Sequence, residues 1–135
     1  MIWSSLSKWE PQALSVLRIV TGFLFMAHGT QKLFGFPAGE KPGPTFPLAT
    51  TMGVGGMLEF VGGLLLLLGL FTRPVAFVLS GMMAVAYFGW HARAGFWPVV
   101  NRGELAALYS FVFLYFVFAG PGPWSVDAYL RRGRR

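Results

Sequence analysis

The 135-residue chain contains no cysteine, which excludes disulfides, thiolate nucleophiles and cysteine-ligated metals. Charge is also scarce, because charged residues make up 12% of the sequence, whereas soluble domains have about 25%. Hydrophobic residues make up 55% of the chain, and the mean hydropathy is +0.58. A soluble four-helix bundle with so few charged residues could not cover itself with polar surface. The composition therefore indicates an integral membrane protein.

Long apolar runs are present in place of charge. Residues 74–90 and 105–126 contain no charged side chain, and residues 11–34 and 51–71 contain only isolated ionisable groups. Each run approaches or exceeds the roughly 20 residues that a helix needs to cross ~30 Å of hydrocarbon. We therefore predict a single all-α domain over residues 1–135, an integral membrane four-helix bundle. Its predicted helices cover about 11–34, 51–71, 74–92 and 103–119.

The positive charges are placed as membrane topology requires. Arg131, Arg132, Arg134 and Arg135 directly follow the last apolar run. Positive residues that flank spans stay cytoplasmic, and four spans put the N-terminus on the same side. We expect a multi-pass protein of the cell (inner or plasma) membrane with both termini cytoplasmic. The net charge of +6 is thereby assigned to topology and to contact with membrane lipid, and no nucleic-acid partner is expected.

Glu59 stands alone in an apolar run, with the glycine pairs 55–56 and 62–63 on either side. A charged side chain at the bilayer centre costs about 2.5–3.5 kcal/mol or more unless it is paired, hydrated or protonated. Small residues let another helix come close. Glu59 is therefore expected to face a neighbouring helix.

Other polar residues are expected to join Glu59 in a pocket under the outer loops. At 1.5 Å per residue, both His28 and Glu59 lie about 10 Å inside the outer membrane boundary. His28 and Lys32 are four residues apart and share one helix face. Together these positions predict an outer-leaflet polar pocket formed by His28, Lys32, Glu59, Tyr87, His91, Asn101 and Glu104.

Simpler interpretations remain open for the same residues. Glu59 with Lys32 or His28 could be an internal ion pair that fixes helix register, and His91 could be an ordinary polar residue at the membrane edge. No close His-x-x-x-His or Glu-x-x-His spacing forms a metal site on one helix, so no metal is expected. Near the inner boundary, Arg18 and Asp127 are expected to form a structural ion pair.

The same positions carry a family resemblance. The motifs, in chain order, are Leu17-Arg18-Ile19, His28-Gly29-x-x-Lys32-Leu33, Glu59-x-x-Gly62-Gly63, Thr72-Arg73, Asn101-Arg102-Gly103-Glu104 and Gly120-Pro121-Gly122-x-x-Ser125-x-Asp127. Taken together they resemble the DoxX family of small four-helix membrane proteins, which is related to the DoxD small subunit of thiosulfate:quinone oxidoreductase. The resemblance implies a four-helix membrane protein linked to redox chemistry, with a soluble enzyme docked on it in some members. Without cysteine, this chain cannot itself shuttle thiols, and its long Pro/Gly loop over 35–50 is a departure.

From residues and resemblance together we expect a redox-linked inner-membrane protein that binds a quinone or a small anionic sulfur compound. Glu59 and His28 would exchange protons, since imidazole titrates near neutrality. No haem, flavin or iron–sulfur ligand set is evident, so electrons would come from a partner oxidoreductase, and independent catalysis stays open. The alternatives are a membrane anchor or assembly subunit without catalysis, and a small anion transporter, which would require a homo-oligomer. The remaining pocket residues are assigned to ligand binding: Lys32, Tyr87, His91, Asn101 and Glu104.

Overall fold

A computed structural model describes residues 2–39 and 43–134, which form helices and short connections without any strand. The expected all-α fold is confirmed for these residues. The chain divides into two compact units, one made of residues 1–72 and 121–135 and the other of residues 73–120.

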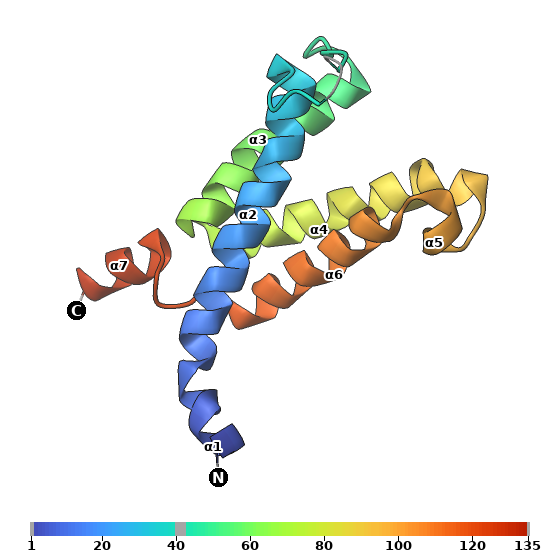
Figure 1. The fold of residues 1–135 in the computed structure, drawn as a ribbon. Helices are drawn as coiled ribbons and strands as arrows, with labels where there is room; N and C mark the ends of the chain where they lie inside the picture. Colours follow the sequence, from blue (N-terminus) through green and yellow to red (C-terminus); the bar gives the residue numbers. More distant parts are fainter. Residues whose placement is uncertain (1, 40–42, 135) are drawn as a thin grey trace. The chain divides into compact units, whose positions relative to one another are not determined.

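The first unit is built on a hairpin of two long helices, α2 (Glu10–Phe34) and α3 (Thr51–Leu68), which run side by side in Figure 1. Two short elements, α1 (Ile2–Leu6) and η1 (Ser7–Trp9), precede α2. The side chain of Thr50 accepts a hydrogen bond from the Gly53 amide and so begins α3. Gly69 ends α3 in the left-handed conformation, at φ 68°. For this reason α3 stops before residue 71, where the sequence placed its end.

The second unit contains α4 (Thr72–Gly89), η2 (His91–Ala94), α5 (Pro98–Asn101) and α6 (Glu104–Ala119). The hydroxyls of Ser80 and Ser110 each donate to the other residue's carbonyl, which joins α4 to α6. Arg73 donates to the carbonyls of Val117 and Phe118 in the last turn of α6. These are carbonyls that a helix end leaves without an internal partner.

A short C-terminal helix, α7 (Val126–Arg132), was not expected from the sequence. The Ser125 side chain caps it by accepting from the Ala128 amide. The backbone of Asp127 donates to the Gly69 carbonyl, so α7 is attached to the turn that follows α3.

Three segments of the described chain are long and apolar enough to cross a membrane: Ile2–Phe34, Thr51–Leu68 and Thr72–Ala94. The fourth apolar helix, α6, has 16 residues and is about 24 Å long at 1.5 Å per residue. It is shorter than the hydrocarbon core, so a fourth span stays a prediction.

Candidate functional site

The polar residues of the first unit lie where the backbones of α2 and α3 come into contact. A Cβ atom added at Gly63 would lie 2.6 Å from the backbone nitrogen of Met26, and one at Gly22 would lie 2.6 Å from that of Leu67. Only glycine fits such an approach, as at other close helix interfaces in membranes. Gly56 and Gly63 form a glycine stripe on the side of α3 that faces α2. This stripe lets side chains of α2 reach the surface of α3.

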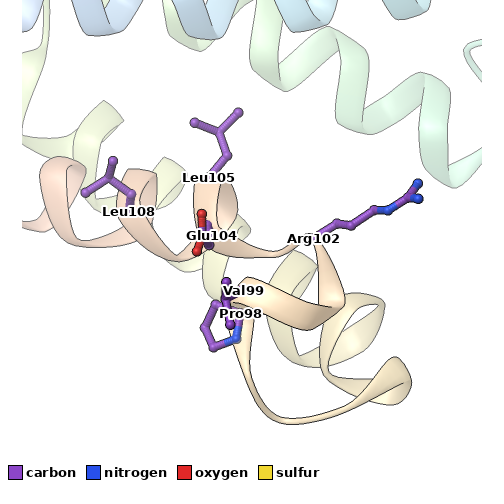
Figure 2. Close-up of a pocket in the computed structure, with 6 residues that line it drawn as sticks. All are labelled: Pro98, Val99, Arg102, Glu104, Leu105 and Leu108. Atoms are coloured by element: carbon purple, nitrogen blue, oxygen red, sulfur yellow. The ribbon is translucent and has the colours of Figure 1, made fainter.

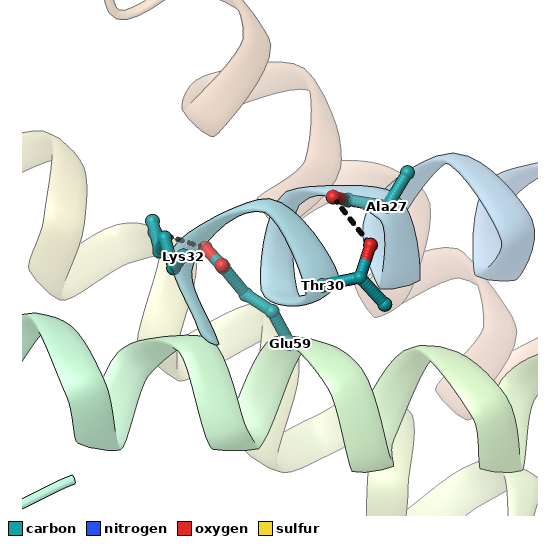
Figure 3. A network of polar contacts seen from close by, with 4 residues as sticks. All are labelled: Ala27, Thr30, Lys32 and Glu59. Carbon is teal, nitrogen blue, oxygen red and sulfur yellow. Dashed lines mark hydrogen bonds and ion pairs between the residues drawn. The ribbon is translucent and has the colours of Figure 1, made fainter. Parts of the chain in front are cut away.

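Lys32 and Glu59 form an ion pair across this interface, shown as a dashed line in Figure 3. The distance from Lys32 Nζ to Glu59 Oε1 is 2.7 Å. Gly56 makes room for the lysine, because a Cβ there would be 3.0 Å from the Cβ of Lys32. The Glu59 side chain is 6% exposed and that of Lys32 is 26% exposed. The pair thus joins a buried carboxylate to a cation that retains access to its surroundings.

The second carboxylate oxygen of Glu59 is left without a partner. Oε2 is buried and accepts no hydrogen bond from any described residue. Leaving a buried acceptor unsatisfied costs about 1–3 kcal/mol, and more when it is charged. Few buried polar groups in native proteins are left this way. A proton on this oxygen, or a donor group on a ligand, would satisfy it.

His28 lies one turn before Lys32 on α2, but its side chain is exposed. The sequence left His28 and Lys32 as alternative partners for Glu59, and the structure pairs Lys32 with it. Thr30, on the same turn, donates from its hydroxyl to the Ala27 carbonyl and so stays within its own helix (Figure 3).

A second polar cluster lies in the second unit and is centred on Asn101, which is 6% exposed. Its amide nitrogen donates to the Gly95 carbonyl at 2.7 Å and to the Tyr87 hydroxyl at 3.2 Å. Its side-chain oxygen accepts from the Gly103 amide at 2.8 Å. The Tyr87 hydroxyl in turn donates to the Phe96 carbonyl. Asn101 and Tyr87 therefore hold the connection from α4 to α6 in place.

His91 contributes to the same arrangement from the start of η2. Its Nδ1 lies 3.1 Å from the backbone carbonyl of Asn101, a distance at which a protonated Nδ1 donates to that oxygen. The side-chain nitrogen and oxygen of Asn101 are already engaged within the protein. Glu104 is exposed at the first residue of α6 and lines an open notch (Figure 2).

The seven residues expected to line one pocket therefore fall into two groups, each inside its own unit. The first unit holds His28, Lys32 and Glu59, and the second holds Tyr87, His91, Asn101 and Glu104. A single pocket built from both groups stays a prediction.

Arg18 is fully buried, and its guanidinium is held by backbone carbonyls. Nε donates to Pro121 at 2.7 Å, and Nη1 donates to Leu66 at 2.6 Å and to Leu67 at 2.8 Å. Nη2 donates to the Trp124 carbonyl. Arg18 thus joins the end of α3 to the Gly-Pro turn before α7.

Asp127 has partners of its own. One carboxylate oxygen accepts from the Phe71 amide and the other from the Thr72 amide, both at 2.9 Å. The direct ion pair expected between Arg18 and Asp127 is therefore corrected: Arg18 binds carbonyls at the end of α3 and in the turn before α7, and Asp127 binds the amides that begin α4. This contact also explains why α4 begins at Thr72, ahead of Pro74.

Sequence reasoning gave no role to Ser15 and mentioned Arg102 only as a neighbour of Glu104. Ser15 is fully buried, and its hydroxyl accepts from the Trp124 amide. Arg102 has a left-handed backbone, at φ 60°. A buried serine has no signature in one sequence, and neither does a left-handed arginine, because glycine is the usual residue in that conformation.

Comparisons with known proteins agree with this architecture. The sequence model of the DoxX family matches residues 13–92. An uncharacterized protein of Haemophilus influenzae is 46% identical over 127 residues, which cover 92% of this chain and 95% of that protein. An uncharacterized membrane protein of Mycobacterium tuberculosis is 32% identical, with 90% of this chain and 83% of that protein covered. The Escherichia coli inner membrane protein YqjF is 29% identical, with 94% and 98% covered.

No solved structure matches the chain. The family match covers more than half of the sequence, and the Haemophilus and Mycobacterium relatives align over nearly all of it. The resemblance seen in the motifs is thereby confirmed. The chain belongs to the DoxX family and is a membrane protein.

Proposed function

We propose that the Lys32–Glu59 pair is a proton-accepting site for a hydroxyl-bearing redox ligand of the quinol class. The observation that carries the proposal is the buried Glu59 Oε2, which has no partner among the described residues. A quinol hydroxyl is a neutral donor that fits this acceptor, and its oxidation requires that its protons be taken up.

The ion pair favours a neutral donor over the small anionic sulfur compound that the sequence also allowed. Lys32 lies 2.7 Å from Glu59 Oε1, so its charge is already balanced. An incoming anion would meet the Glu59 carboxylate at the same place, and like charges at short range repel. A hydroxyl group meets no such repulsion.

Glu59, Lys32 and His28 have separate roles in the proposed oxidation. Oxidation of a quinol to a quinone releases two protons and two electrons. Glu59 takes the first proton at Oε2, which weakens its pairing with Lys32 and makes the ammonium available to the quinolate oxygen. His28, one turn away on α2, takes the second proton. Both electrons pass to a partner oxidoreductase, so this chain acts as a membrane subunit.

The topology that accompanies this function has four spans and two cytoplasmic termini. Arg131 and Arg132 lie in α7, in the unit that also contains α1. Helix α6 would span with help from local bilayer thinning, which costs a fraction of a kcal/mol per Å. In this orientation Lys32 and Glu59 lie in the outer leaflet of the inner membrane.

The test is equilibrium binding of a benzoquinol and of its oxidised quinone to the purified protein in mild detergent. Glu59→Gln should weaken quinol binding about tenfold, because it removes a hydrogen bond to a charged acceptor, and should leave quinone binding unchanged. Glu10→Gln, at an exposed position that begins α2, is the matched control. Equal quinol binding by wild type and Glu59→Gln would overturn the proposal.

A second variant separates a ligand site from a pair that only fixes helix register. If the pair only fixes register, replacing both partners together (Glu59→Leu with Lys32→Met) should leave thermal stability equal or higher and change no binding, as replacement of buried ion pairs often does. That outcome would favour the alternative role of a membrane anchor or assembly subunit without its own catalysis.

A further inference from the structure

An open notch of about 380 Å³ lies beside the start of α6, within the second unit. One wall comes from α5 and the other from the first turns of α6, as Figure 2 shows. The notch is lined by Pro98, Val99, Arg102, Glu104, Leu105 and Leu108. It therefore combines four apolar side chains with one cation and one anion.

The two charged side chains on the notch have no partner among the described residues. No side-chain hydrogen bond or ion pair joins Arg102 or Glu104 to another residue in the described ranges, and the two side chains do not pair with each other. Figure 2 shows the Arg102 side chain extending away from Glu104. The notch thus presents a positive and a negative group at separate points of its rim.

The backbone holds Arg102 at this rim in an uncommon conformation. Its φ of 60° is left-handed, a region that costs a residue with a side chain roughly 1 kcal/mol relative to glycine. The next residue is a glycine for a different reason, since a Cβ at Gly103 would lie 2.7 Å from Asn101 Oδ1 and 2.8 Å from the Tyr87 ring. Residues kept in such conformations cluster at functional sites.

We propose that this notch binds the headgroup of a zwitterionic phospholipid that carries a primary ammonium, of the phosphoethanolamine type. The Arg102 guanidinium pairs with the phosphate, and the Glu104 carboxylate pairs with the ammonium. An acyl chain lies over Leu105 and Leu108. This inference uses none of the three residues of the quinol proposal, Glu59, Lys32 and His28, and stands independently of it; Glu104, expected from sequence as a pocket residue, is assigned to the notch instead.

A membrane lipid suits the notch better than a soluble ligand of the same charge. Leu105 is 48% exposed and Leu108 is 62% exposed, on a helix that carries no charged residue after Glu104. Phe96 and Trp97, in the loop before α5, are also exposed, at 68% and 69%. Aromatic residues of this kind gather at headgroup level, which is the depth of a lipid phosphate.

The opposite charges also select among lipids. A purely anionic headgroup would pair with Arg102 but would leave Glu104 beside another negative group. A choline headgroup has no N–H and cannot donate to the Glu104 carboxylate. Only a headgroup with both a phosphate and a primary ammonium satisfies both side chains.

The test measures lipid retention by native mass spectrometry of the detergent-purified protein with added phosphatidylethanolamine, phosphatidylcholine or phosphatidylglycerol. Wild type should retain phosphatidylethanolamine in preference to the other two. Glu104→Gln should abolish that preference, and Arg102→Gln should lower phosphatidylethanolamine retention about tenfold. Arg93→Gln, at an exposed arginine of η2 that does not line the notch, should behave as wild type.

A further variant and a competition measurement separate loss of the lipid site from loss of folding. Arg102→Gly removes the guanidinium but suits the left-handed backbone, so it should fold at least as well as wild type and still lose the lipid. Soluble phosphoethanolamine, which lacks acyl chains, should compete poorly. The proposal is overturned if Arg102→Gly retains the lipid, if Arg93→Gln loses it equally, or if soluble phosphoethanolamine displaces it at equal concentration.

Discussion

The contact between α2 and α3 makes a sharp prediction about two glycines. Gly63 lies in α3 and Gly81 in α4, both inside helices. A Cβ at Gly63 would lie 2.6, 2.7 and 2.8 Å from the backbone nitrogen, Cα and Cβ of Met26, whereas one at Gly81 would meet nothing within 4 Å. Replacing either by alanine gains about 1 kcal/mol of helix propensity. Only Gly63→Ala must also push two backbones apart.

The expected magnitude follows from comparing the two variants. Overpacking a close contact costs about 1–3 kcal/mol, and the propensity gain is common to both changes. Gly63→Ala should therefore have a free energy of unfolding about 1–3 kcal/mol lower than Gly81→Ala. Gly81→Ala itself should equal or exceed wild type.

The assay is equilibrium unfolding in detergent, followed by circular dichroism. Gly89→Ala is a second control, because a Cβ there also meets open space. If Gly63→Ala is as stable as Gly81→Ala, the backbones of α2 and α3 are not in contact. The close contact between α2 and α3, on which the pairing of Lys32 with Glu59 depends, would then be contradicted.

Three further predictions concern the ends of the helices and the topology. Arg18→Met should lower the free energy of unfolding by at least about 3 kcal/mol in the same assay, because several buried carbonyls lose their hydrogen-bond donor. Arg73→Met changes an exposed arginine and should lower it by about 1 kcal/mol. Asp127→Ala should be less stable than Asp127→Asn, which keeps one acceptor oxygen. Exchanging the residues at 18 and 127 should not recover the stability that either single change loses; full recovery would show that the two side chains form a direct ion pair. Because the chain has no cysteine, Gly39→Cys should react with an impermeant maleimide in intact cells and Gly133→Cys only after lysis, and the reverse result would invert the topology.

The burial of Glu59 could be predicted from sequence because a glycine stripe surrounds it. Gly56 and Gly63 mark the side of α3 that another helix can approach, and Glu59 lies on that side. The pairing of Glu59 with Lys32 could not be predicted in this way. It depends on side-chain reach and on the space that Gly56 leaves for the lysine stem, which only the packed structure shows.

The helix ends were harder to predict because tertiary contacts decide them. Depth arithmetic placed Arg18 and Asp127 near each other, and opposite charges suggested a pair. Backbone carbonyls and amides released at the ends of α3 and α4 compete for the same side chains, and no one-dimensional pattern reveals that competition. The Arg102 conformation is similar, since it depends on how Asn101 holds the Gly103 amide.

The central claim is that Glu59 takes a proton from a bound quinol, and infrared difference spectroscopy tests it most directly. The bound benzoquinol is oxidised to the quinone at an electrode, which takes up the two electrons, and the spectra before and after oxidation are subtracted for wild type and Glu59→Gln. A protonated carboxyl band that appears during quinol oxidation in wild type and is missing in Glu59→Gln is the predicted result. The same band in both proteins, or in neither while the quinol is bound, would contradict the claim.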